Sequence, residues 1–182
     1  MLQDIDNTVY NFLTNIHNPI FDGYFGFITN FGDIVIGSVI LFIFLFYLYK
    51  KKKYFLIIFV SFNVIVGELF SIILKYLIAR QRPTDINTFL NIGNFSFPSA
   101  HSIVSITLYF SILIIITKYF RKYRINKRIK KFIQIILIIL LISIPLSRLY
   151  LGVHWFSDVI GGILIGISIV YFSMKMFKIN SH

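Results

Sequence analysis

Five apolar segments, each close to the length that crosses a lipid bilayer, constrain this chain of 182 residues more than any other feature. A transmembrane helix needs about 20 mainly apolar residues. The whole chain is 57% hydrophobic with a mean hydropathy of +0.81, well above the apolar share of a soluble domain. The sequence therefore predicts an all-α, polytopic transmembrane helix bundle with about five spanning helices: Ile34–Tyr49, Tyr54–Ala79, Ser99–Thr117, Phe132–Leu146 and Trp155–Phe177.

The first 33 residues differ from the rest and are predicted to form a separate N-terminal interfacial segment, with residues 34–182 as the transmembrane core. Apolar side chains recur there at helical spacing with polar residues between them, which is typical of an amphipathic helix lying at the membrane surface. Pro19, Gly23 and Gly26 then predict a second, looser piece. A helical hairpin that dips into the interface is the open alternative. The apolar positions are Leu2, Ile5, Val9, Phe12, Leu13 and Ile16.

Most of the 18 Lys and Arg residues lie in three stretches that contain no acid: Lys50–Lys53, residues 118–131, and Lys175 with Lys178. The positive-inside rule places these basic stretches and the C-terminus in the cytoplasm. The N-terminus, residues 81–98 and the link between the last two spans then face outward, as expected for a multi-pass plasma membrane protein. The net charge of +11 is explained by this topology, so no nucleic-acid partner is predicted.

Three short motifs lie on the predicted outward side, each at the end of a span. A charge at the centre of a membrane helix costs about 2.5–3.5 kcal/mol on insertion scales, so the polar side chains gathered there require an explanation. Phosphate chemistry is the leading one. The motifs are Lys75 with Arg82-Pro83, then Pro98-Ser99-Ala100-His101, then Ser147-Arg148 with His154 and Asp158.

The cations and the second motif suit a phosphate group. Arg82 and Arg148 can each give a forked pair of N–H donors to phosphate oxygens, and Lys75 adds a compact positive charge. Pro98-Ser99 is typical of a helix start, where Ser99 caps the helix and the next backbone N–H groups face an anion. These residues are predicted to bind phosphate.

The histidines suit covalent catalysis. His154 and Asp158 are four residues apart, so Asp158 can hold one ring nitrogen of His154 and leave the other free to attack phosphorus. His101 would protonate the departing oxygen, and a phosphohistidine would be the intermediate. The chain has no cysteine and no compact set of carboxylates, so neither a cofactor nor a metal ion is predicted.

The motifs KYLIARQRP, PSAH and SRLYLGVHWFSD resemble the signature of the type 2 phosphatidic acid phosphatase family, membrane relatives of the vanadium haloperoxidases. The order and internal spacing of the family pattern are kept from about Leu69 to Gly166. Two departures are visible: Ala100 stands where the family has glycine, and the first of the six spans of many bacterial members is missing. If position 100 needed a positive φ, alanine there would be strained.

The resemblance implies a metal-independent lipid phosphate phosphatase working at the outer membrane face. Phosphate would be bound by Lys75, Arg82, Arg148, Ser99 and the Ala100 N–H, with His101 as acid, His154 as nucleophile and Asp158 as its partner. Undecaprenyl diphosphate is the favoured substrate, ahead of phosphatidic acid and phosphatidylglycerophosphate. A vanadate-dependent oxidase or a non-enzymatic membrane protein, such as an anion conduit, are the distant alternatives.

Several other residues receive simpler interpretations. Arg80 is interpreted as a cation that extends to lipid headgroups. Glu68, two turns before Lys75, is expected either to bond to the site from behind or to make a purely structural hydrogen bond. Gly162-x-x-x-Gly166 predicts close helix packing, with dimerisation as the weaker reading. Residues 84–97 are expected to form a partial lid or headgroup selector.

Overall fold

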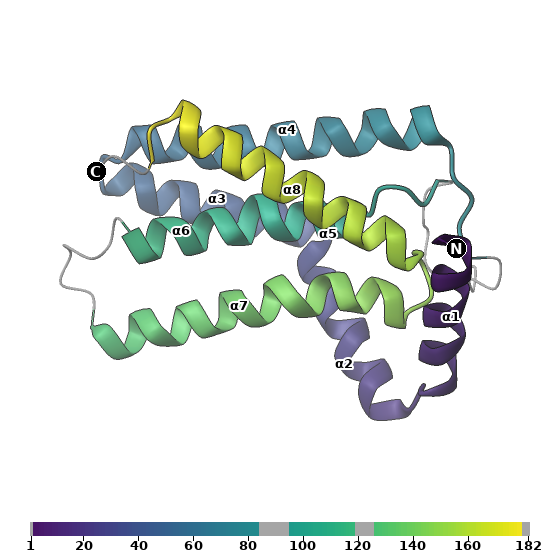
Figure 1. Cartoon of the computed structure of the whole chain (residues 1–182). Helices are drawn as coiled ribbons and strands as arrows, with labels where there is room; N and C mark the ends of the chain where they lie inside the picture. Colours follow the sequence, from purple (N-terminus) through teal and green to yellow (C-terminus); the bar gives the residue numbers. More distant parts are fainter. Residues whose placement is uncertain (1, 84–94, 119–125, 180–182) are drawn as a thin grey trace.

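The computed structural model describes residues 2–83, 95–118 and 126–179, and every regular element in these ranges is helical (Figure 1). In chain order the elements are α1 (Leu2–Asn15), α2 (Pro19–Thr29), the 3-10 turn η1 (Asn30–Gly32), α3 (Ile34–Lys50), α4 (Tyr54–Ile78), α5 (Ala100–Val104), the π-helical η2 (Ser105–Phe110), α6 (Ser111–Lys118), α7 (Lys127–Tyr150) and α8 (Phe156–Met176).

Four described helical segments are long and apolar enough to cross a membrane: α4, the continuous α5–η2–α6 segment, α7 and α8. A fifth crossing results if η1, α2 and α3, which bend by 57° at residue 33, count as one broken span. The predicted multi-span helix bundle is therefore confirmed. The main difference in bounds is at α7, which begins at Lys127 rather than Phe132 because the Asn126 side chain caps it by accepting a hydrogen bond from the Arg128 N–H.

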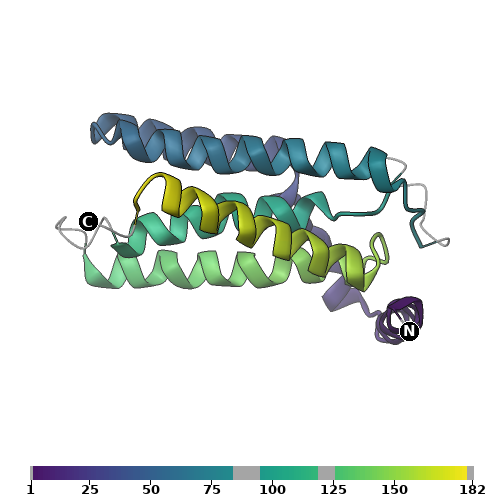
Figure 2. The same cartoon turned by 45° about the horizontal axis from the view of Figure 1, so that its top comes forward.

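The N-terminal segment is more regular than predicted. The expected first helix is present as α1, but Gly23 and Gly26 do not loosen the second piece, which is the continuous helix α2. Asn18 caps α2 through side-chain hydrogen bonds from two backbone N–H groups, and Pro19 occupies the first helical position, where its missing N–H costs nothing. Figures 1 and 2 show α1 lying across one end of the bundle, with α2 packed beside α7.

Small residues let α8 approach the start of the third span, as the Gly162-x-x-x-Gly166 spacing predicted. A Cβ atom on Gly162 would lie 2.7 Å from the Ser99 backbone oxygen, and one on Gly166 would lie 2.7 Å from Ile106 Cβ. Asn63 links α4 to α6 by donating to Ser111 Oγ over 2.9 Å inside the bundle. The close contact at Gly162 fixes Ser99, and with it the whole second motif, against α8.

Replacing Gly162 with alanine should destabilise the bundle, because the clash is with backbone and cannot be relieved by a side-chain rotation. Overpacking of this kind costs about 1–3 kcal/mol, which should lower the melting temperature of the purified protein in detergent. Gly23→Ala is the matched control, since a Cβ there meets nothing within 4 Å and alanine favours helix. A melting temperature for Gly162→Ala equal to that of Gly23→Ala would contradict the packing argument.

Candidate active site

All three predicted motifs meet at one end of the bundle, where α4 and α7 end and α5 and α8 begin (Figures 1 and 2). The basic link between α3 and α4, the start of α7 and the end of α8 lie at the opposite end. The predicted separation of the motifs from the basic stretches is thus confirmed. Which end faces outward remains a prediction.

The first motif begins in the last turn of α4 and continues beyond the helix. The helix ends at Ile78, one residue before the predicted Ala79, because Ala79 adopts a left-handed conformation with φ 48° and its N–H closes the helix on the Lys75 carbonyl. Lys75 therefore stays in the last helical turn, while Arg82 lies beyond the helix. The break turns the chain back toward the link between α7 and α8.

Arg82 reaches across the site to the predicted nucleophile. Its Nη1 atom donates to the Val153 carbonyl over 2.6 Å and lies 3.2 Å from His154 Nε2. Lys75 Nζ donates to the Phe95 carbonyl over 3.0 Å, just ahead of the second motif. Both cations of the first motif thus contact the chain that carries the other motif residues.

The second motif starts a helix, as predicted. Ser99 is fully buried and its side chain accepts a hydrogen bond from the Ser102 N–H, while its own N–H donates to the Asp158 carbonyl over 3.1 Å. Ala100 is the first residue of α5 and is not one of the described residues with a positive φ, so the departure from the family glycine causes no backbone strain. His101 lies in the first turn of α5.

The third motif contains three buried ionisable groups of the site. Arg148 is 5% exposed, His154 4% and Asp158 0%. His154 Nδ1 lies 3.6 Å from Asp158 Oδ2, at ion-pair distance but too far for a hydrogen bond, and Asp158 Oδ2 accepts instead from the Trp155 N–H over 2.9 Å. The predicted orientation of His154 by Asp158 needs a shift of several tenths of an ångström, which is common in catalytic groups without a ligand.

The surroundings of His154 favour a neutral ring with its lone pair on Nε2. Burial lowers the pKa of His154 well below 6.5, and the positive charges of Arg148, Arg82 and Lys75 lower it further. A guanidinium can only donate hydrogen bonds, so Nε2 must be the acceptor in the contact with Arg82. The proton of the neutral ring then sits on Nδ1, facing Asp158.

Two residues of the N-terminal segment contact predicted site residues. The sequence analysis did not identify these two contacts. Thr29 Oγ1 accepts a 2.6 Å hydrogen bond from Arg148 Nη1. Asp33 Oδ1 lies 3.1 Å from His101 Nε2, close enough for an ion pair. The Arg148 Nε atom, although buried, has no hydrogen-bond partner among the described residues, so its N–H is available to a ligand.

Arg80 is the clear correction to the sequence interpretation. It does not extend to headgroups as a lone cation but forms ion pairs with Asp158 Oδ1 at 2.7 Å and with Asp6 Oδ2 at 2.6 Å. The left-handed turn at Ala79 explains the difference, because it redirects the chain after α4 and brings Arg80 to these two carboxylates. Its position two residues before Arg82 was the one available signal.

Two other predictions have different outcomes. Glu68 makes no hydrogen bond with the site among the described residues, and its negative charge acts on Lys75 only electrostatically. The predicted lid or headgroup selector, residues 84–97, falls almost entirely outside the described residues.

Residues 55–181, more than half of the chain, match the profile of the PAP2 superfamily. The chain is 34% identical over 105 residues to phosphatidylglycerophosphatase B of Bacillus subtilis, a match that covers 58% of this chain and 49% of that protein. It is 26% identical over 185 residues to lipid A 4'-phosphatase of Porphyromonas gingivalis, covering 96% of this chain and 73% of that protein. The first match therefore spans only about half the length of the Bacillus subtilis protein.

Two solved structures share the fold. The crystal structure of a transmembrane PAP2-type phosphatidylglycerolphosphate phosphatase from Bacillus subtilis matches with a TM-score of 0.82 and 24% identity, over 97% of this chain and 86% of that one. LpxE from Aquifex aeolicus matches with a TM-score of 0.68 and 23% identity, over 92% and 93%. With the profile match, the three motifs and their meeting at one end of the bundle, these comparisons establish that the chain belongs to the PAP2 superfamily.

Proposed function

We propose that this protein is a metal-independent lipid phosphate phosphatase that works through a phosphohistidine. The observation that carries the proposal is the setting of His154: its Nε2 faces Arg82 Nη1 at 3.2 Å, and the charges of Lys75, Arg82 and Arg148 all act on its ring. Cationic donors around a nucleophile are what the transfer of a phosphoryl group needs, because negative charge spreads over three oxygens in the transition state.

The reaction would proceed in two steps. His154 Nε2 attacks phosphorus, the bond from phosphorus to the lipid oxygen breaks, and His101 gives its proton to that oxygen. Water then attacks the phosphohistidine, His101 takes the proton of the water, and inorganic phosphate leaves as Nε2 is restored. Lys75, Arg82, Arg148, Ser99 and the Ala100 N–H would hold the phosphate oxygens throughout.

The motif end of the bundle is proposed to face outward, at the membrane–water interface, because the basic stretches at the other end favour the cytoplasm. A lipid substrate could then keep its tail in the bilayer while its phosphate enters the site. Undecaprenyl diphosphate is proposed first, since it needs no room for a large headgroup. Phosphatidylglycerophosphate is the second candidate, supported by the name of the 34% identical relative, and phosphatidic acid the third.

The test is phosphate release by the purified protein from a panel of lipid phosphates in detergent: undecaprenyl diphosphate, phosphatidylglycerophosphate and phosphatidic acid. We expect release that persists in EDTA and stops with orthovanadate, which mimics five-coordinate phosphorus. Release lost in EDTA would contradict the metal-independent mechanism. Halide oxidation by the vanadate-loaded protein would favour an oxidase, and no release from any lipid would favour a non-enzymatic role.

A further inference from the structure

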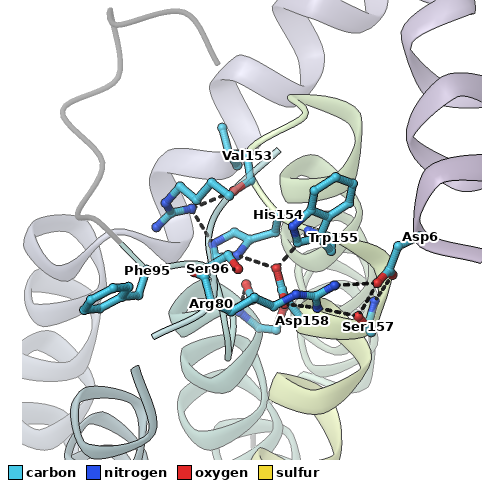
Figure 3. Close-up of polar contacts among 12 residues, drawn as sticks. Asp6, Arg80, Phe95, Ser96, Val153, His154, Trp155, Ser157 and Asp158 are labelled. Carbon is cyan, nitrogen blue, oxygen red and sulfur yellow. Dashed lines mark hydrogen bonds and ion pairs between the residues drawn. The ribbon is translucent and has the colours of Figure 1, made fainter. Parts of the chain in front are cut away.

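A polar network that extends beyond the fixed positions of the three motifs joins the N-terminal helix to the candidate active site, as Figure 3 shows. Its members are Asp6 of α1, Arg80 after α4, and Ser157 with Asp158 in the first turn of α8. Asp6 and Arg80 are 74 residues apart in the chain, and neither is a fixed position of the family pattern. Asp158 is the only one of the four that the sequence assigned to the site.

Asp6 is the one buried residue of α1, at 1% exposure, in a helix that is otherwise half-buried or exposed. A buried carboxylate is costly unless hydrogen bonds and a cation compensate it. Here Arg80 Nη2 donates over 2.6 Å, the Ser157 N–H over 2.8 Å and Ser157 Oγ over 2.7 Å. Burial alone would raise the pKa of Asp6, but these hydrogen bonds outweigh burial and the pKa is lowered, so the carboxylate is charged at neutral pH.

Arg80 uses its two terminal nitrogens on two different carboxylates. Nη2 binds Asp6, while Nη1 donates to Asp158 Oδ1 over 2.7 Å and to Ser157 Oγ over 2.6 Å. The guanidinium also lies over the Trp155 ring, 5.6 Å from its centroid. Because the planar fork is held on both sides, Arg80 cannot turn away from Asp158 without breaking its contact with Asp6.

The contacts of Arg80 restrict the Asp158 carboxylate, which faces the proposed nucleophile His154. With Oδ1 bound to Arg80 and Oδ2 bound to the Trp155 N–H, the Asp158 carboxylate is held in one orientation, with Oδ2 3.6 Å from His154 Nδ1. A shift of the His154 ring by several tenths of an ångström then closes the hydrogen bond. We infer that Asp6 and Arg80 are positioning residues of the active site: Asp6 holds Arg80, Arg80 holds Asp158, and Asp158 orients His154. The inference rests on the proposed function and makes α1 part of the catalytic unit.

The competing explanation is that Asp6 only tethers α1 to the bundle. Tyr10 of α1 offers a comparison, because its ring packs at the same corner, 5.9 Å from that of Trp155. A simple tether should make the loss of Tyr10 about as harmful to turnover as the loss of the Asp6 charge. If Asp6 has a positioning role, the loss of its charge should reduce turnover far more than the loss of Tyr10.

The experiment measures kcat and KM for lipid phosphate hydrolysis by full-length Asp6→Asn, which keeps the shape of the side chain and removes its charge. We expect kcat to fall about 10- to 100-fold, the usual effect of removing a group that orients an active-site residue, with KM changed less than threefold. Asp6→Glu should recover part of kcat. Asp4→Asn, on the exposed side of the same helix, is the charge-matched control and should match the wild type.

Two further variants keep the test decisive. Tyr10→Leu should lower the melting temperature while keeping kcat within about threefold of the wild type, and an equal loss of kcat in Tyr10→Leu and Asp6→Asn would overturn the inference. If Asp6→Asn cannot be purified in folded form, Ser157→Ala replaces it, because the Ser157 hydroxyl bridges Asp6 and Arg80. Wild-type kcat in that variant would equally overturn the inference.

Protection by orthovanadate separates this inference from the proposed function. An oriented His154 should bind vanadate, so vanadate should raise the melting temperature of the wild type and of Asp4→Asn but not that of Asp6→Asn. That pattern supports the positioning role even if no lipid on the panel is hydrolysed, which would count against the proposed function alone. A wild type that is neither active nor protected would contradict both, and an active Asp6→Asn with full protection would contradict only the positioning role.

Discussion

The His154→Ala variant is expected to fold and enter the membrane like the wild type while releasing phosphate at least about 10⁴-fold more slowly, since removal of a nucleophile leaves only binding and electrostatic catalysis. The replaced ring is 4% exposed and surrounded by positive charge. The ring lies in the link between α7 and α8, outside both helices, so the bundle should keep its fold. Phosphate release from the same lipid panel, at equal protein in detergent, is the measurement.

The matched control is His17→Ala, because His17 is a second histidine near this end of the bundle but lies outside the motifs. Its ring contacts Asp22 and the Tyr150 carbonyl, joining α1 and α2 to α7. This variant should lose some stability and keep its turnover. Turnover by His154→Ala comparable to the wild type would rule out His154 as the nucleophile. A phosphoprotein intermediate that still forms in His154→Ala would do the same.

The pH dependence offers a second measurement on the same residue. The attacking ring must be neutral, and burial followed by the charges of Arg148, Arg82 and Lys75 lowers the pKa of His154 well below 6.5. Protonation of the ring, and loss of the nucleophile, therefore occurs only at lower pH than for an exposed histidine. The acid limb of kcat/KM should lie below pH 6.5, because this ratio reports groups of the free enzyme.

The motif residues could be predicted because their spacing reflects simple geometry. His154 and Asp158 are four residues apart, with His154 just before α8 and Asp158 in its first turn, so the carboxylate lies near the ring. Ser99 follows a proline and precedes an apolar run, which marks a helix start. Alternation of apolar spans and basic stretches then placed the motifs at one end of the bundle without any knowledge of tertiary contacts.

The residues that support the motifs could not be predicted in the same way, because their contacts join segments distant in sequence. Thr29 meets Arg148 across 119 residues, and no local pattern predicts that pairing. Asp6 had a weak signal: with Val9 and Leu13 it shares the face of α1 that turns toward the bundle, where a carboxylate needs a partner. Its contact with Arg80 depends on the left-handed turn at Ala79. Alanine at that position does not predict such a turn.

The loss of activity in the His101→Ala variant should depend on the leaving group of the substrate. This dependence distinguishes a general acid from a nucleophile. General acid catalysis is worth about 10²- to 10⁴-fold, but only where the departing oxygen needs a proton. An alkoxide from a lipid monophosphate is a strong base and needs one, whereas nitrophenolate is a weak base and leaves unaided. We expect a loss in that range with phosphatidic acid and a loss at least about tenfold smaller with p-nitrophenyl phosphate, measured as kcat/KM.

The two histidine variants then form a matched pair. His154→Ala should lose activity on both substrates, because the attack on phosphorus precedes any help to the leaving group, and His101→Ala should be partly rescued by the activated ester. Equal losses of His101→Ala on both substrates would mean that His101 binds the phosphate rather than protonating the lipid oxygen. Its contact with Asp33, 3.1 Å from Nε2, holds the ring in one orientation, as a proton donor aimed at the departing oxygen requires.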